Sequence, residues 1–191
     1  MNTKDEIVYF CNELHPVGAL MLTGEWGCGK TYLIEHDVKK ELSDTHIIVR
    51  ISLFGISSID EFNKVVKKRW VDECAPFFKA GDDEGLIPVG KTIVSILGKI
   101  GKTVTPGSEI IAETALSINP FDFVKIKPII SGGNKHVVLV FDDLERSKLN
   151  TTDILGCINE YCENLEFLVI IVANENIITK QSKKVHIINW R

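Results

Sequence analysis

The sequence lacks the cysteine and histidine patterns that hold disulfide frameworks and metal ions. Its five cysteines are an odd number and no two have C-x-x-C spacing, while its five histidines form no H-x-x-x-H pair. These absences argue against a disulfide-stabilised secreted domain and against a zinc cage. They indicate a reducing environment, and we expect the protein to be cytoplasmic.

Long apolar runs are also missing. Nowhere does the chain hold the roughly 18 consecutive apolar residues of an obvious membrane span, and the N-terminal MNTKDEIVYF carries acids where a signal peptide has its apolar core. The formal net charge of −4 argues against a surface that coats nucleic acid, and the basic cluster KVVKKRW at 64–70 is interpreted as the solvated face of a helix. We therefore expect no membrane span and no direct nucleic-acid binding.

What the sequence does contain is an alternation of apolar runs and helical patterns. Predicted strands cover 19–22, 46–54, 136–141 and 166–173, and predicted helices cover 4–14, 31–42, 57–75 and 151–163. Because the strands are apolar throughout, the sequence predicts a mainly parallel sheet with helices on both faces, which is a three-layer αβα core. A chain of 191 residues suits one sizeable core, so we expect a single domain over 1–191.

Residues 76–134 interrupt this alternation. They hold most of the prolines and show no clear succession of long elements. We predict an irregular helical insertion there, with short helices near 90–104, 107–117 and 123–130. The tail after 178 is short, basic and weakly patterned.

Two segments match the phosphate-loop pattern G-x-x-x-x-G-K-[ST], namely GEWGCGKT at 24–31 and GLIPVGKT at 85–92. The first follows a predicted buried strand and opens a predicted helix, so that backbone N–H groups and the helix N-terminus can bind phosphates. The second follows the acidic FFKAGDDE, which is no strand, and Pro88 removes an N–H from it. We predict a nucleotide site at the first copy and an ordinary loop with an exposed Lys91 at the second.

The residues of the first loop have distinct expected roles. The glycines can reach positive φ, Lys30 is expected to meet the β- and γ-phosphates, and the hydroxyl of Thr31 is expected to bind Mg²⁺. Cys28 is interpreted as a small tolerated residue, with an oxidation-sensitive off-switch as the alternative. The predicted nucleotide-binding residues are Gly24, Glu25, Trp26, Gly27, Cys28, Gly29, Lys30, Thr31 and Tyr32.

A second half of the site is predicted at the end of HVVLVFDD. Asp142 follows a buried strand and is expected to hold Mg²⁺ together with Thr31, although an acid in this place can also cap a helix. Either Asp143 or Glu145 would orient or deprotonate the attacking water, and Asp143 is favoured.

Two further side chains complete the predicted catalytic set. Arg146 either pairs with one of the neighbouring acids or contacts the γ-phosphate. Asn174, at the end of the strand 166–173, either holds the attacking water and senses the γ-phosphate or serves as a cap or turn residue.

Taken together, GEWGCGKT, ISLFGISSIDEF, VVLVFDDLER and LVIIVANENII resemble the KAP family of P-loop NTPases, over roughly residues 5–178. The family is related to the AAA+ and STAND ATPases. Trp26 fits its G-x-W-G-x-G-K-[ST] loop, and 142–146 fit its D-D-L-[DE]-R strand end. The resemblance implies an extra strand between the nucleotide-loop strand and the acid-bearing strand. It also implies ATP and Mg²⁺ binding, slow hydrolysis, a nucleotide-driven conformational change and a protein partner or self-association. Many relatives are bacterial, and some act in anti-phage defence.

Two features leave alternatives open. Relatives often carry an insertion with membrane spans, but lysines interrupt the apolar residues of 87–104, so we expect an insertion without a span and keep peripheral membrane contact as the alternative. Relatives also continue into a helical lid, which we expect to be absent here, so a nucleotide-binding switch without turnover is the alternative to an ATPase.

Two other classes of nucleotide-binding protein are disfavoured. A GTPase is disfavoured because the N-K-x-D motif is missing, and a small-molecule kinase is disfavoured because no arginine-rich lid is evident.

Overall fold

The computed structural model describes residues 2–13, 18–77, 125–130, 134–174 and 186–189. The second phosphate-loop match at 85–92, the segment 87–104 considered for membrane contact, and the predicted helices 90–104 and 107–117 lie outside these ranges.

The strands and helices follow the predicted alternation. The strands are β1 (Leu20–Gly24), β2 (His46–Ser52), β3 (Ile129–Ile130), β4 (Lys135–Asp142), β5 (Leu168–Asn174) and β6 (His186–Asn189). The helical segments are α1 (Thr3–Asn12), α2 (Lys30–Tyr32), η1 (Leu33–Val38), α3 (Lys39–Glu41), α4 (Ile59–Cys74), η2 (Ala75–Phe77), η4 (Leu144–Arg146), α7 (Thr151–Asn159) and η5 (Glu160–Asn164). The four predicted strands are confirmed, and so are the helices predicted at 4–14, 31–42, 57–75 and 151–163.

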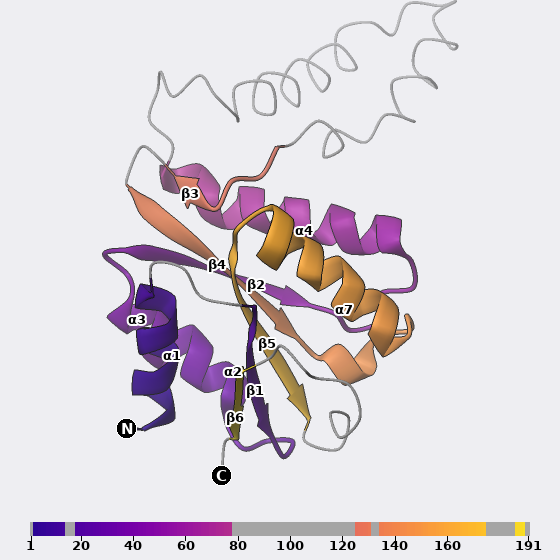
Figure 1. The fold of residues 1–191 in the computed structure, drawn as a ribbon, viewed down its shortest axis with the longest axis horizontal. Coiled ribbons are helices and arrows are strands. Elements are labelled where there is room, and N and C mark those ends of the chain that lie inside the picture. Colours follow the sequence, from indigo (N-terminus) through magenta and orange to yellow (C-terminus); the bar gives the residue numbers. More distant parts are fainter. Residues whose placement is uncertain (1, 14–17, 78–124, 131–133, 175–185, 190–191) are drawn as a thin grey trace, which may run out of the picture.

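The sheet places the phosphate-loop strand and the acid-bearing strand on either side of β5. The strand order is β2-β4-β5-β1-β6, with neighbours parallel, and β3 pairs antiparallel with β4. The extra strand between β1 and β4 that the resemblance implies is therefore present, and it is β5 (Figure 1). Because β1, β2, β4 and β5 are parallel, their carboxyl ends share one edge, where the register pairs Gly24 with Asn174 and Ser52 with Asp142.

One prediction about the less regular segments was wrong, and one strand was not predicted. Residues 125–130 are not helical, and Ile129 and Ile130 form β3 instead. Pro128 explains this, since it biases the preceding residue toward extended backbone and has no N–H for a helix. The weakly patterned tail contains β6, which pairs with β1.

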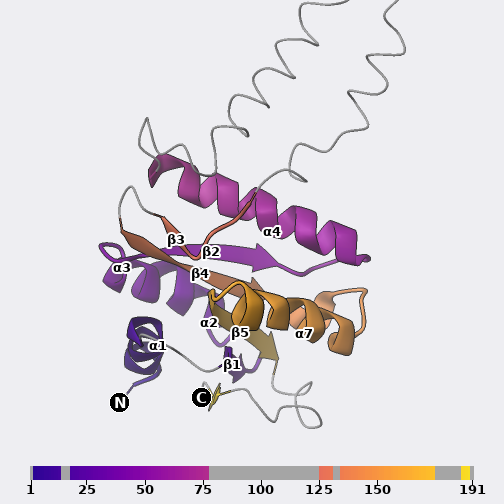
Figure 2. The same ribbon diagram turned by 45° about the horizontal axis from the view of Figure 1, so that its top comes forward.

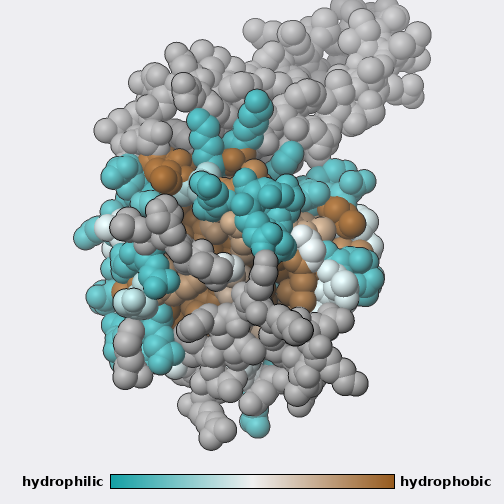
Figure 3. All heavy atoms as spheres, in the orientation of Figure 1, coloured by the Kyte–Doolittle hydropathy of each residue, from teal (hydrophilic) through white to brown (hydrophobic). Residues whose placement is uncertain are grey.

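Alternate strand residues divide the core into two apolar layers. Leu139 and Phe141 of β4 pack with the residues of α4 and α7, whereas Val138 and Val140 pack with those of α1 and the helical run 30–42. Figures 1 and 2 show these two sets of helices on opposite faces of the sheet. Figure 3 shows hydrophilic side chains at the left, at the right and across the upper centre of the described part, with hydrophobic ones between them. The predicted three-layer αβα fold is confirmed.

Helix α4 shows how the sequence sets one of these layers. The Ser58 hydroxyl accepts a hydrogen bond from the backbone N–H of Glu61 at 3.1 Å, so Ser58 is the N-cap of this helix. The buried residues of the helix are Phe62, Val66, Trp70 and Cys74, every fourth position. Among the described residues, no helix has both the length and the apolar character needed to cross a bilayer.

His46 is a buried polar residue at the start of β2. Its Nε2 lies 2.8 Å from the carbonyl oxygen of Cys11, and its Nδ1 lies 2.8 Å from the Thr45 hydroxyl. Because a carbonyl only accepts, Nε2 carries the proton, and the neutral ring satisfies both partners. Burial lowers the pKa of His46 from 6.5, partly offset by the hydrogen bond to Cys11, and His136 and Lys135 lower it further.

We predict that His46 makes the protein less stable in mild acid. The unfolded chain takes up a proton near pH 6.5 whereas the folded ring resists protonation, so this contribution to stability is present above pH 6.5 and is lost as pH falls toward the lowered folded pKa. Urea unfolding measured from about pH 5 to 7.5 should give a shallower pH dependence for His46→Gln, whose amide can still donate to Cys11. Equal slopes for the two proteins would contradict the prediction.

Candidate nucleotide site

The loop between β1 and α2 has the backbone that its glycines allow. Gly27 has φ of 76° and Gly29 has φ of 96°, a conformation that side chains with a Cβ rarely adopt. The buried Nζ of Lys30 donates to the carbonyl oxygens of Gly24 and Glu25, both at 2.8 Å. The ammonium group therefore lies inside the curve of the loop.

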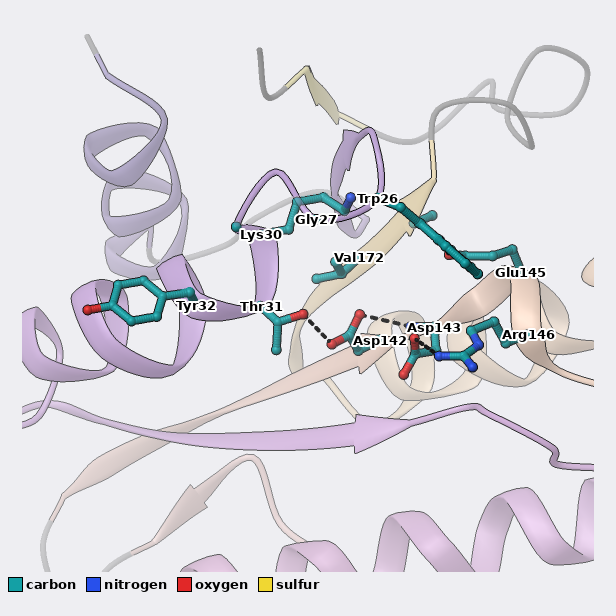
Figure 4. A pocket seen from close by; sticks show the side chains of 12 residues that line it. Trp26, Gly27, Lys30, Thr31, Tyr32, Asp142, Asp143, Glu145, Arg146 and Val172 are labelled. Carbon is teal, nitrogen blue, oxygen red and sulfur yellow. Dashed lines mark hydrogen bonds and ion pairs between the residues drawn. The ribbon is translucent and has the colours of Figure 1, made fainter.

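Across β5, the carboxylate of Asp142 closes the other side of the site. Asp142 is 5% exposed, and its Oδ2 accepts a hydrogen bond from the Thr31 hydroxyl at 2.9 Å. Its Oδ1 accepts from the backbone N–H of Asp143 at 2.8 Å. Figure 4 shows the bond between Thr31 and Asp142 linking the loop helix to the end of β4.

Arg50 of β2 is part of this cluster, and the sequence reasoning missed it. Its Nε and Nη2 lie 2.9 and 2.8 Å from Oδ2 of Asp142, the oxygen that Thr31 also binds. The arginine supplies the positive charge that a buried carboxylate needs. A signal was available, because Arg50 is the one charged residue inside the apolar run 47–54.

Asp143 is held on the β2 side of the site. Its backbone is left-handed, with φ of 60° and ψ of 37°. Its Oδ2 accepts from the Ser52 hydroxyl at 2.8 Å, and its Oδ1 lies 3.6 Å from Nη1 of Arg146. The ion pair is the first of the two interpretations given for Arg146, whose guanidinium also lies 4.2 Å from the ring centre of Phe54.

Glu145 turns the other way, toward the loop. Its Oε1 accepts from the indole N–H of Trp26 at 2.8 Å, and its Oε2 accepts from the backbone N–H of Asn174 at 3.3 Å. Figure 4 shows Trp26 and Glu145 side by side at the rim of the cleft.

These groups surround a cleft of about 340 Å³. Its lining is Trp26, Gly27, Gly29, Lys30, Thr31, Tyr32, Asp142, Asp143, Glu145, Arg146, Val172 and Ala173. Ten of these were predicted, whereas Val172 and Ala173 of β5 were not. Four predicted residues, Gly24, Glu25, Cys28 and Asn174, are not in the lining, although all four contact it through hydrogen bonds.

A buried strand that leads into a glycine loop and helix, with an acid-bearing strand separated from it by one other strand, defines a P-loop NTPase fold. The KAP family P-loop domain matches residues 5–187. The chain therefore belongs to the KAP family, and it is a nucleotide-binding P-loop NTPase. No curated protein sequence matches it. A solved structure of Drosophila ORC bound to DNA aligns with a TM-score of 0.46 and 15% identity, over 97% of this chain and 41% of that one.

We predict that the pair of Arg50 and Asp142 stabilises the fold through its charges. Arg50→Leu leaves a buried carboxylate without its cation, and we expect the free energy of unfolding to fall by about 2 kcal/mol. This loss of stability is smaller than for a fully buried ion pair, because the Arg50 side chain is 31% exposed. Urea denaturation measures the loss.

The matched control is Asp142→Asn, which needs no cation. The double variant Arg50→Leu/Asp142→Asn should lose less stability than the two single losses added together. Strictly additive losses would show that the two side chains do not stabilise one another.

Proposed function

We propose that this protein binds ATP and Mg²⁺ between the loop 24–31 and Asp142, hydrolyses the nucleotide slowly, and uses the cycle to drive a regulatory conformational change. The observation that carries the proposal is the hydrogen bond between Thr31 and Asp142, which brings both expected Mg²⁺-binding groups to one point. The buried Lys30 lines the same cleft as these two residues.

The loop suits a triphosphate. Lys30 donates to two loop carbonyls, so its ammonium group already faces the inside of the curve, where phosphate oxygens would replace those carbonyls as acceptors. Open space lies where a Cβ of Gly27 or Gly29 would stand, which leaves the backbone accessible to phosphate. We assign the phosphate contacts to the backbone of 24–31 and to Lys30.

The residues present also fit Mg²⁺. The Thr31 hydroxyl and the Asp142 carboxylate are hard oxygen donors that lie 2.9 Å apart, the ligand type that Mg²⁺ prefers. When bound, Mg²⁺ would neutralise charge on the β- and γ-phosphates. Thr31 and Asp142 would hold it, and Arg50 would keep the carboxylate of Asp142 in place.

Asp143 is the better candidate for activating the attacking water. It follows Asp142 directly, and its carboxylate is positioned from the β2 side by Ser52 and Arg146. Glu145, the other candidate, is instead held at the rim of the cleft by Trp26 and the backbone of Asn174. For Asn174 we keep the proposed role of holding the water and sensing the γ-phosphate.

The wider biological role is a prediction. We propose one nucleotide-binding domain with an insertion at about 76–134, a protein partner or self-association, and the bacterial anti-phage role that the family resemblance implies. The competing function is a nucleotide-binding switch without turnover. The switch is favoured by the ion pair between Arg50 and Asp142. This pair already balances the charge of the Asp142 carboxylate without a metal ion.

We expect ATP with Mg²⁺ to raise the melting temperature through Lys30. At about 100 times the dissociation constant, ATP adds about 2.7 kcal/mol, or roughly 5–10 °C for a domain of this size. Lys30→Ala should abolish most of this shift in a thermal melt. Lys91→Ala, which changes the lysine of the second motif, is the control and should retain it. Equal shifts of the melting temperature in wild type and Lys30→Ala would show that the loop 24–31 does not bind the nucleotide through Lys30.

We expect Asp143→Asn to slow phosphate release by about a hundredfold or more while ATP still binds, because the amide cannot take a proton from water. Single-turnover phosphate release and the ATP-induced melting shift together measure the two effects. Wild type that binds ATP but releases no phosphate would establish the switch. Unchanged release by Asp143→Asn would show that another group activates the water.

A further inference from the structure

The side chain of Glu145 connects three separate parts of the nucleotide site. The residue itself belongs to the turn η4, one oxygen accepts from Trp26 in the loop, and the other accepts from the backbone of Asn174 at the end of β5. Figure 4 shows this carboxylate reaching across the rim of the cleft toward Trp26. Glu145 thus lies between the expected phosphate loop and the opposite wall.

Asp143 differs from Glu145 in its partners. The hydrogen bond and ion pair of its carboxylate go to Ser52 of β2 and to Arg146 of its own turn. The two acids that follow Asp142 therefore have different surroundings. The carboxylate of Asp143 is held within one wall of the cleft, whereas Glu145 joins the two walls.

Polar contacts rather than burial position the Trp26 side chain. Its side chain is 64% exposed, so packing against the core does not determine where it points. Its N–H is bound by Glu145, and the guanidinium of Arg146 lies 5.4 Å from its ring centre. The neighbouring Gly27 and Gly29 give this loop a backbone with few steric restraints. The bond at Trp26 therefore adds a restraint to this loop beyond those that Lys30 makes with the carbonyls of Gly24 and Glu25.

We propose that Glu145 is a positioning residue that fixes the phosphate loop, through Trp26, in the conformation that binds the triphosphate. This rests on the proposed function and deepens it. Losing the link costs affinity for nucleotide, because the loop must then be ordered at the moment of binding. Glu145 does not take the proton from water, and its effect on turnover follows from the position of the loop.

Three single variants and one double variant separate this role from that of a general base. Glu145→Ala and Trp26→Phe break the same bond from its two ends, so each should weaken ATP binding by about fivefold in titration calorimetry, the size of one hydrogen bond. The double variant should be no weaker than the worse single variant. Glu145→Gln keeps an oxygen for Trp26, so it should keep most of the affinity and lower phosphate release by only about threefold, against a hundredfold or more for a lost base.

The charge-matched control is Asp44→Ala, which removes an exposed acid in the turn before β2, at the opposite edge of the sheet, and should change nothing. Losses in Trp26→Phe and Glu145→Ala that multiply in the double variant would overturn the proposal. A collapse of phosphate release in Glu145→Gln at unchanged affinity would do the same and would make Glu145 the base.

A readout without nucleotide keeps this test separate from the proposed function. The indole N–H resonance of Trp26, assigned by its loss in Trp26→Phe, should shift in Glu145→Ala and stay in place in Asp44→Ala. If wild type binds no ATP but this resonance shifts, the proposed function fails and the link between Glu145 and Trp26 still holds. An unchanged resonance in Glu145→Ala would overturn the link itself.

Discussion

The buried carboxylate of Asp142 is the group on which the rest of the site depends. Burying an ionised acid is costly unless its oxygens are fully hydrogen-bonded and its charge is balanced. Thr31, Arg50 and the backbone of Asp143 meet this demand from three directions. The demand explains why β2 carries an arginine inside an apolar run, and why the loop helix begins opposite the end of β4.

The strand order places the phosphate loop and Asp142 on two sides of one cleft. Because β5 lies between β1 and β4, the loop and Asp142 are separated by one strand, whose residues Val172 and Ala173 line the cleft between them. Two side chains reach across that gap at different places. Thr31 reaches Asp142 near the bottom of the loop, and Trp26 reaches Glu145 at the rim. The loop is thus fixed at both of its ends, while its glycines leave the backbone between them accessible.

Much of this could be predicted from the sequence, because the main elements depend on local patterns. The apolar runs predicted four strands, the helical periodicity predicted four helices, and the loop with the acid-bearing strand end predicted ten residues of the cleft. The pairs Arg50–Asp142 and Trp26–Glu145 could not be predicted, since they join residues 92 and 119 positions apart and depend on strand register. Strands β3 and β6 were missed because each is too short for its own pattern to show, and pairing with β4 and β1 stabilises them.

The central claim is that a triphosphate binds between the loop amides of 24–31 and the carboxylate of Asp142. An experimental structure of the protein with Mg²⁺ and a non-hydrolysable ATP analogue tests it most directly. The account predicts phosphate oxygens on the loop amides and on the ammonium group of Lys30, with the metal ion beside Thr31 and Asp142. A nucleotide bound away from these groups, or a structure in which Thr31 and Asp142 lie at different edges of the sheet, would contradict it.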